Sequence, residues 1–304
     1  MSVAAVVVSY NRLDYLKKCL AALEQQTRPL DEIIVIENGS TDGSAEYIRD
    51  SHPTVTMFET GANLGGAGGF AWGVEIALAH GHDAAWLMDD DAEPELDALA
   101  PLMEKFESMA PRPAFLASLV TAGRGEFNPR NPPVVSRDAH KQVRASELGG
   151  IAIDAATFVG VLINLQVAAA THLPFKDFFI WIDDSEYTHR LSKMGFAMTV
   201  KESQVNHPVA KGIGEDMGSR LFFHVRNSLW YIRERGFPLG TNVFDVLLLI
   251  QHSLHQGLAA RSKKDWFVAV AKGYGQGFFT KPTRQMPGEL LATLTTEARE
   301  RINC

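Results

Sequence analysis

Residues 3–26, VAAVVVSYNRLDYLKKCLAALEQQ, combine two hydrophobic periodicities in one short stretch. Val3 to Tyr10 are continuous and rich in β-branched residues, which is the pattern of a parallel strand covered on both faces. The leucines at positions 13, 16, 20 and 23 are then spaced by three and four, which predicts an amphipathic helix. A buried strand followed directly by a helix is the repeating unit of a parallel α/β sheet.

The same alternation continues through the first hundred residues. Strands are predicted over residues 32–40, 54–60 and 84–90, and helices over 41–51, 68–81 and 92–106. We therefore expect an α/β fold with a doubly wound, mostly parallel, Rossmann-like sheet.

Composition and charge narrow the class of protein. The chain has 304 residues, of which 46% are hydrophobic and 21% charged, enough to bury a full core. Its formal net charge of -7 argues against a general nucleic-acid-binding protein, because such proteins usually carry a basic excess. The two cysteines, Cys19 and Cys304, imply no disulfide framework. We expect neither a signal peptide nor a membrane span, and a cytoplasmic location.

Polar residues and glycines follow four of the predicted strands at the points where the strands end. The segments are Ser9 to Arg12, Glu37 to Ser40, Asn63 to Gly69, and Asp89 to Asp91. Ligands of doubly wound sheets bind at the carboxyl ends of the strands. Neither a Walker-type phosphate loop nor a G-x-G-x-x-G motif occurs in the first strand-helix turn. The pattern favours a mononucleotide site over an NAD domain or a P-loop NTPase.

Three consecutive aspartates need an explanation, because adjacent carboxylates repel one another where water is partly excluded. A divalent cation would remove that repulsion, and Mg²⁺ or Mn²⁺ takes oxygen ligands that it shares with substrate phosphates. We expect Asp89 and Asp91 to bind the cation, and Asp90 to point toward the ribose or across the strand end. The alternative is a solvated acidic turn that caps the following helix.

The glycine run NLGGAGGF, residues 63–70, also has two interpretations. Glycines at a strand-to-helix turn can serve positive backbone angles and close packing alone. They can also admit a diphosphate to the backbone N–H groups at the start of the helix, which we place near Gly69. The neighbouring aspartates favour the second interpretation, since a cation would hold carboxylate and diphosphate together.

The ordered set of these segments resembles the family 2 inverting glycosyltransferases with a GT-A fold. The resemblance implies that the first two loops hold the nucleoside, and that an Asp-x-Asp element, here Asp89 and Asp91, holds the metal and the diphosphate. Residues that it assigns to the nucleotide sugar are Ser9, Tyr10, Asn11, Arg12, Glu37, Asn38, Asp42, Asn63, Gly65, Gly66 and Asp90. Glu37-Asn38 replaces the Asp-Asp pair of many members, although Asn38 can still hydrogen-bond a pyrimidine edge.

A second acidic cluster lies in WIDDSEY, residues 181–187, at the head of a predicted helix. Acidic residues are common there because of the helix dipole alone. An inverting transferase also needs a base that removes the proton of the acceptor hydroxyl. The resemblance favours Asp184 over Asp183 for that role, and places Trp181 and Glu186 on the acceptor side, although Trp181 can equally belong to the core.

A histidine follows another predicted strand, in QVNHPVAKG. A lone histidine is more often a structural or surface residue. The resemblance makes His207 the third metal ligand, and neutral imidazole suits Mn²⁺.

The sugar is inferred from the same segments. NLGGAGGF, DDDAEP and WIDDSEY together look most like galactofuranosyltransferases that begin or extend a cell-wall galactan, which implies UDP-galactofuranose as the donor. Bacterial rhamnosyltransferases share much of the pattern, so dTDP-rhamnose stays the alternative donor. A nucleotidyltransferase and a non-catalytic sugar-binding module are disfavoured by the pairing of two acidic sites.

The C-terminal part departs from simple alternation. Helices rich in apolar and aromatic residues are predicted over 219–236, 243–260 and 265–279. They either pack on one another or present a membrane-facing surface, which would suit a lipid-linked or polysaccharide acceptor and a peripheral position on the inner face of the cell membrane. We expect a GT-A domain over 1–215, with a nucleotide-sugar half (1–100) and an acceptor half (101–215), and a helical region over 216–304.

Overall fold

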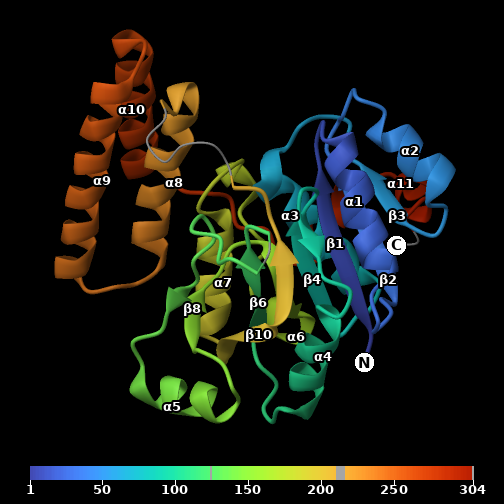
Figure 1. Ribbon diagram of the computed structural model, residues 1–304. Coiled ribbons are helices and arrows are strands. Elements are labelled where there is room, and N and C mark those ends of the chain that lie inside the picture. The colour runs from blue at the N-terminus through green and yellow to red at the C-terminus, as the bar shows by residue number, and fades with distance from the viewer. Residues whose placement is uncertain (124, 210–215, 303–304) are drawn as a thin grey trace.

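A large mixed β-sheet organises the protein (Figure 1). The computed structural model describes residues 1–123, 125–209 and 216–302. Within these residues the large sheet has eight strands, in the order β3-β2-β1-β4-β9-β6-β10-β5. Their bounds are β1 (Val3–Ser9), β2 (Glu32–Glu37), β3 (Thr56–Glu59), β4 (Ala84–Asp89), β5 (Glu93–Pro94), β6 (Phe115–Thr121), β9 (Val159–Asn164) and β10 (Ala197–Asn206).

Strand direction follows the alternation of the sequence. β3, β2, β1 and β4 are parallel to one another, and β6 is parallel to β10. β9 runs antiparallel between β4 and β6, and the short β5 pairs antiparallel with β10. A small second sheet joins β7 (Val134–Val135) to β8 (Ile153–Ala155). The expectation of a mostly parallel α/β sheet is confirmed.

Helices cover both faces of the sheet, which explains why the first strand is apolar throughout. In β1, Ala4, Val6 and Val8 belong to the core that includes α3, whereas the alternate residues of the strand face α1 and α4. The helices of this part are α1 (Leu13–Glu24), α2 (Ser44–Ser51), α3 (Gly65–Ala79), α4 (Leu99–Ser108), α5 (Ala139–Glu147), α6 (Leu165–Ala168) and α7 (Asp183–Ser192), with the 3-10 turn η1 (Lys176–Phe178).

The glycine run lies inside α3, not before it. The helix begins at Gly65, so the predicted start near Gly69 is wrong. A Cβ atom on Gly69 would come within 2.5 Å of Val8 Cγ1, and one on Gly73 within 2.1 Å of Val6 Cγ1. These two glycines let α3 approach β1 closely, which is the packing interpretation. Gly66 differs, because nothing lies within 4 Å of the position its Cβ would take.

The segment after the aspartates also differs from the prediction. Residues 92–106 were expected to form one helix, but Glu93 and Pro94 form β5 and the helix α4 begins only at Leu99. Pro94 has no N–H to donate, and it lies on an edge strand where that loss is tolerated. The Glu93 pairing with Asn206 of β10 turns the chain across the carboxyl ends of the sheet.

The predicted C-terminal helices are present as α8 (Leu221–Glu234), α9 (Leu239–Ala259) and α10 (Lys263–Phe279), preceded by the turn η2 (Gly218–Arg220). They stand beside the sheet (Figure 1) and share a small core of their own that includes Val225, Leu229 and Leu249. Among the described residues, no helix has both the length and the apolar character needed to cross a bilayer.

Residues 280–302 run back to the sheet and end in η3 (Leu291–Thr293) and α11 (Thr296–Glu300). Leu290 and Ile302 are buried in the same core as Val6. Both carboxylate oxygens of the buried Glu75 in α3 accept the backbone N–H of Gly288. The predicted division at residue 215 stays a prediction. Cys19 is a buried free thiol, and Cys304 lies outside the described residues.

Candidate active site

The three predicted metal ligands converge at the carboxyl edge of the sheet. Asp89 ends β4, Asp91 follows two residues later, and His207 comes directly after β10. One potential ligand atom from each of the three lies within 4.8 Å of the others. His207 Nε2 is 3.2 Å from Asp91 Oδ1. The β5 pairing with β10 brings residues 91–94 alongside the end of that strand, so a two-residue strand assembles the cluster.

The charges of this cluster are unbalanced without a further cation. Burial raises the pKa of Asp89 well above its ordinary value, and the negative charges of Asp91, Asp90 and Asp183 raise it further. Burial opposes ionisation of Asp91 as well, but His207 and Arg12 outweigh it and lower the pKa of Asp91. Asp91 Oδ1 is buried, and the imidazole of His207 is the group that faces it. This donor set, two carboxylates and an imidazole, fits Mn²⁺ or Mg²⁺.

Asp90 points back toward the first loop. Its carboxylate accepts a hydrogen bond from the backbone N–H of Tyr10 at 3.0 Å and lies 3.5 Å from Arg12 Nη1. Burial raises the pKa of Asp90 to about 6. The same arginine nitrogen also pairs with Asp91. Asp90 therefore ties the end of β1 to the end of β4, and its expected role toward the ribose stays a prediction.

The first two predicted nucleotide loops are bonded to each other. Asn11, with a positive φ of 52°, accepts the backbone N–H of Thr41 at 2.8 Å, and Asp42 accepts that of Leu13 at 2.8 Å. The buried Glu37 accepts the backbone N–H groups of residues 39 and 40. Ser9 is also buried, whereas Tyr10, Asn11 and Arg12 are exposed at the same edge. Asn11 and Arg12 are engaged by Thr41 and by the aspartates, so the exposed ring of Tyr10 is the most accessible of these side chains to a nucleotide.

Asn38 links the second loop to the start of α3. Its side chain donates to the carbonyl oxygen of Gly65 at 2.9 Å and accepts the backbone N–H of Leu64 at 3.0 Å. Asn63 is exposed, and its side-chain oxygen accepts the backbone N–H of Gly65 at 2.8 Å. A Cβ atom on Gly65 would overlap the carbonyl oxygen of Phe179, at 2.0 Å. Gly65 therefore packs against the loop that carries the second acidic cluster.

That loop is strained. Phe179, Trp181 and Ile182 have positive φ values of 64°, 67° and 71°, which bulky side chains rarely adopt. The buried Asn227 of α8 holds the strained backbone, since its side-chain amide donates to the carbonyl oxygens of Phe178, Ile180 and Trp181 at 2.8, 2.9 and 3.0 Å. The last of these residues precedes Asp183 by two positions. Neither the loop's backbone angles nor the role of Asn227 was predicted from the sequence.

The two candidate bases have different surroundings. Asp183 is the more buried, and its negative charge acts on Asp89 across the site. Asp184 accepts the backbone N–H of Ser185 through Oδ1. Burial raises the pKa of both carboxyls, and the charge of Asp184 raises that of Asp183 further. The charge of Asp183 thus reaches the cluster of Asp89, Asp91 and His207, and the pKa values of both acids are shifted upward, the direction useful for a base.

Comparison with known proteins shows the family of this chain. The family model described as glycosyl transferase family 2 matches residues 4–162. The chain belongs to glycosyl transferase family 2. It is 35% identical over 217 residues to the galactofuranosyltransferase GlfT1 of Mycobacterium tuberculosis, covering 68% of this chain and 70% of that protein. It is 25% identical over 297 residues to an N-acetylglucosaminyl-diphospho-decaprenol L-rhamnosyltransferase of the same species, covering 85% and 94%.

The fold of this family 2 glycosyltransferase has solved counterparts. S. aureus TarS, crystallised with UDP, aligns with a TM-score of 0.62 and 13% identity over 100% of this chain and 88% of the crystallised one. At that identity the likeness concerns the fold, which is the expected GT-A architecture. The predicted glycosyltransferase activity is confirmed by the family membership.

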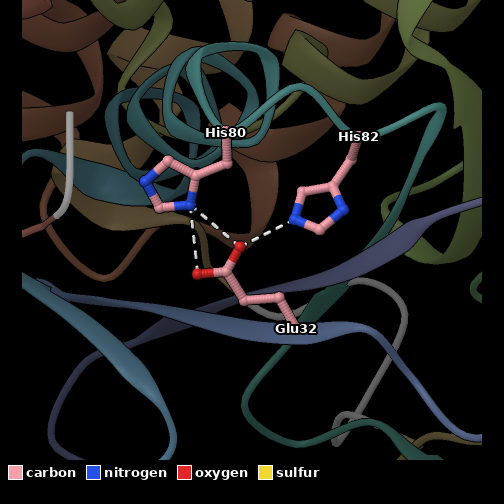
Figure 2. A group of neighbouring side chains, drawn as sticks. All are labelled: Glu32, His80 and His82. Carbon is pink, nitrogen blue, oxygen red and sulfur yellow. Dashed lines mark hydrogen bonds and ion pairs between the residues drawn. The ribbon is translucent and has the colours of Figure 1, made fainter.

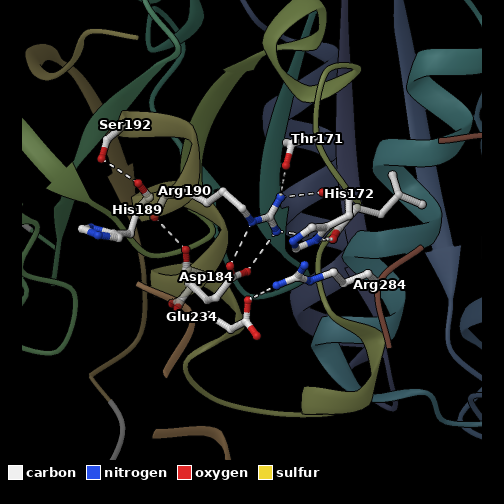
Figure 3. Close-up of polar contacts among 11 residues, drawn as sticks. Thr171, His172, Asp184, His189, Arg190, Ser192, Glu234 and Arg284 are labelled. Atoms are coloured by element: carbon white, nitrogen blue, oxygen red, sulfur yellow. Dashed lines mark hydrogen bonds and ion pairs between the residues drawn. The ribbon is translucent and has the colours of Figure 1, made fainter. Parts of the chain in front are cut away.

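Glu186, predicted to bind the acceptor, forms an ion pair with Arg190. Both carboxylate oxygens of Glu186 pair with Arg190, at 2.9 and 3.0 Å. Arg190 also donates to Thr171 and to the carbonyl oxygen of His172, so it ties α7 to the preceding loop (Figure 3). The role of Glu186 in acceptor binding stays a prediction. Trp181 is half-buried, with its ring centroid 6.0 Å from that of His224.

Proposed function

We propose that this enzyme transfers galactofuranose from UDP-galactofuranose, with inversion and with Mn²⁺ or Mg²⁺, to a lipid-linked or polysaccharide acceptor in the synthesis of a cell-wall or surface glycan. The observation that carries the proposal is the meeting of two acidic clusters at one edge of the sheet. Asp89, Asp91 and His207 form one, and Asp183 and Asp184 the other. A nucleotide-sugar diphosphate needs the first, and an acceptor hydroxyl needs the second.

Asp89, Asp91 and His207 would hold the cation. When bound, it would supply positive charge to the diphosphate that leaves. The exposed Tyr10, Asn63 and the open position beside Gly66 offer surface to the nucleotide and diphosphate at the same edge.

Asp184 is our first choice for the base and Asp183 our second. A carboxylate that removes the acceptor proton works best when its pKa lies close to the working pH. Burial raises the pKa of both residues in that direction. The backbone just before both acids has positive φ at Trp181 and Ile182 and is held by Asn227, which supports a fixed start of α7. Trp181 then offers an aromatic face on the acceptor side of α7.

The galactofuranose donor rests on the relatives rather than on the geometry. The galactofuranosyltransferase is the more identical relative, whereas the rhamnosyltransferase matches more of the chain. dTDP-rhamnose therefore remains the second candidate donor. Membership of family 2 leaves no case for a nucleotidyltransferase or a non-catalytic sugar-binding module.

The experiment that tests the proposal is a donor screen. The protein is incubated with Mn²⁺, a polyprenyl-diphosphate-linked oligosaccharide and each nucleotide sugar in turn, and release of the nucleoside diphosphate is measured together with the mass of the product. Transfer from UDP-galactofuranose supports the proposal. Transfer from dTDP-rhamnose alone would make dTDP-rhamnose the donor in place of UDP-galactofuranose. Transfer that persists fully in the presence of a chelator would overturn the metal requirement.

We also propose peripheral contact with the cytoplasmic face of the cell membrane. Helices α9 and α10 expose large apolar side chains: Leu239, Val243, Phe244, Leu247, Leu248, Ile250, Leu254, Leu258, Phe267, Val268, Phe278 and Phe279. Leu258 is 81% exposed and Phe279 89%. Amphipathic helices of this kind bind the boundary between head groups and acyl chains. Such contact would bring the enzyme to a lipid-linked acceptor.

A further inference from the structure

A second group of potential metal ligands lies at the opposite edge of the sheet. Glu32 begins β2, His80 follows α3, and His82 lies just before β4. In Figure 2 both imidazole rings point toward the Glu32 carboxylate. Glu32 Oε2 is 2.8 Å from His80 Nδ1 and 2.7 Å from His82 Nε2. Glu32 lies at one end of β2 and Glu37 at the other, so the length of the strand, about 17 Å at roughly 3.3 Å per residue, separates this group from the active-site edge.

The group is mostly buried. The side chains of Glu32, His80 and His82 are 16%, 9% and 10% exposed. The Glu32 carboxylate lies within hydrogen-bond distance of both rings and of the Thr56 hydroxyl. The Thr56 hydroxyl donates to Oε1, which fixes the carboxylate with Oε2 toward the two rings. Three donor atoms therefore converge in a place that excludes most water.

The outer contacts of the two histidines suit metal ligands. His80 Nε2 lies 2.6 Å from the carbonyl oxygen of Ile302, which can only accept, so this nitrogen carries a proton and Nδ1 is the one left for a ligand. A metal-bound histidine characteristically donates its other ring N–H to a backbone carbonyl in this way. His82 Nδ1 is buried without a hydrogen-bond partner among the described residues. His82 Nε2 and His80 Nδ1 face the Glu32 carboxylate, which can only accept, so a bound ion would take the place of the protons on these two nitrogens.

We propose that Glu32, His80 and His82 form a Zn²⁺ site that anchors the C-terminal segment to the sheet. Two imidazoles and one carboxylate are a donor set that Zn²⁺ accepts, and a water molecule would supply the fourth ligand. Because His80 is bonded to Ile302, an ion that fixes its ring also fixes the end of the segment over residues 280–302. The site is independent of the proposed transferase chemistry.

The test separates this group from the active-site cluster. The Asp91→Asn chain is dialysed against a chelator, supplied with Zn²⁺ and desalted, and bound zinc is then measured by mass spectrometry. We expect about one Zn²⁺ per chain, and a rise of roughly 5 °C in Tm at saturating Zn²⁺. Adding His82→Gln to this chain should abolish both effects. The visible spectrum of Co²⁺ in the Asp91→Asn chain provides a readout that does not depend on the second variant folding.

A matched control is His52, whose Nδ1 lies 2.6 Å from Glu24 in a pair with one histidine only. In the Asp91→Asn chain, His52→Gln should leave zinc stoichiometry unchanged. The proposal is overturned if the Asp91→Asn chain binds no Zn²⁺ and shows no tetrahedral Co²⁺ spectrum. It is equally overturned if His82→Gln folds and still binds one Zn²⁺.

Discussion

Arg12 contacts two of the three consecutive aspartates from the exposed side of the site. The sequence predicted it as a nucleotide ligand, and the structure pairs it with Asp90 and Asp91. The local sequence predicts that a side chain lies at the end of a strand. It does not predict which of several nearby side chains forms an ion pair with it. The identity of the site was therefore predictable from the order of the motifs, whereas the pairing of its charges was not.

Replacing Asp91 by Asn should abolish transfer and remove the metal dependence of UDP binding, because it removes a negatively charged oxygen ligand. Tm should fall modestly at neutral pH, since the pKa of Asp91 is lowered by His207 and Arg12 and its charge therefore stabilises the folded state. Calorimetric titration of UDP with and without Mn²⁺ checks this. Asp97→Asn, at an exposed acid a few residues away, is the control and should behave as the wild type. Normal transfer by Asp91→Asn would refute the metal assignment.

Replacing Asp184 by Asn should lower kcat by about 10²- to 10⁴-fold while UDP binding persists, because the amide cannot accept the acceptor proton. In the wild type, the fall of kcat with decreasing pH should begin at a higher pH than an ordinary carboxyl would give, since burial raises the pKa of Asp184. Rate profiles against pH, with donor binding followed separately, test both statements.

Asp183→Asn is the comparison. It should reduce kcat less, and should raise Tm at pH 7.5. The folded-state pKa of Asp183 is raised by burial, so its ionisation removes stability as pH increases above the unfolded-state value of about 3.9. If Asp183→Asn loses turnover and Asp184→Asn does not, the base is Asp183. If neither loses turnover, the acids serve only the helix dipole.

At the scale of elements, α8 holds the strained loop that precedes Asp183, through the side chain of Asn227. Asn227→Ala should cost about 1–3 kcal/mol of the free energy of unfolding, because it removes a buried amide that donates to three backbone carbonyl oxygens. It should also lower kcat with little change in KM for the donor, since the donor loops follow other strands. Denaturant unfolding and steady-state kinetics provide the two measurements. Asn242→Ala, in α9 and away from this loop, is the matched control. An equal loss of kcat in that variant would contradict a specific role of Asn227 in positioning the loop.

The glycines of α3 should separate into two classes. Gly73→Ala should destabilise the fold by about 1–3 kcal/mol, because the added methyl group overlaps Val6. Gly66→Ala meets no neighbour and should change stability by no more than about 1 kcal/mol, yet weaken donor binding if the diphosphate approaches there. Chemical denaturation and UDP titration of both variants decide this. Equal stability of the two would contradict the packing assigned to Gly73.

Elements with a strong period were predictable, and elements fixed by distant pairing were not. The β1, β2 and β4 strands and helices α1 and α8 follow from apolar spacing alone. The two-residue β5 exists because β10 lies beside it, and a polar pair such as Glu93-Pro94 carries no strand signal of its own. The start of α3 was misplaced for a similar reason, since glycines read locally as a loop.

At the scale of the whole molecule, the apolar face of α9 and α10 should bind lipid. The protein should co-sediment with vesicles, and attraction to anionic head groups should weaken with salt, which screens over about 10 Å at ordinary ionic strength. Leu247→Glu with Leu254→Glu should release it, because the two exposed side chains lie two helical turns apart on one face of α9. Leu96→Glu, an equally exposed leucine beside the sheet, is the control. Self-association without vesicle binding would assign the face to a second copy.

The return of residues 280–302 to the sheet sets the order in which the polypeptide can mature. The segment leaves the ribosome after every strand has emerged, yet Leu290 and Ile302 complete the core around Val6. Until they arrive, the nascent chain presents an open apolar surface and a buried carboxylate, Glu75, without its backbone donors. Domains commonly fold during synthesis. The core around Val6 must wait for residues 280–302, so a ribosome that stalls before this segment would leave a product that chaperones and proteases can distinguish from the folded enzyme.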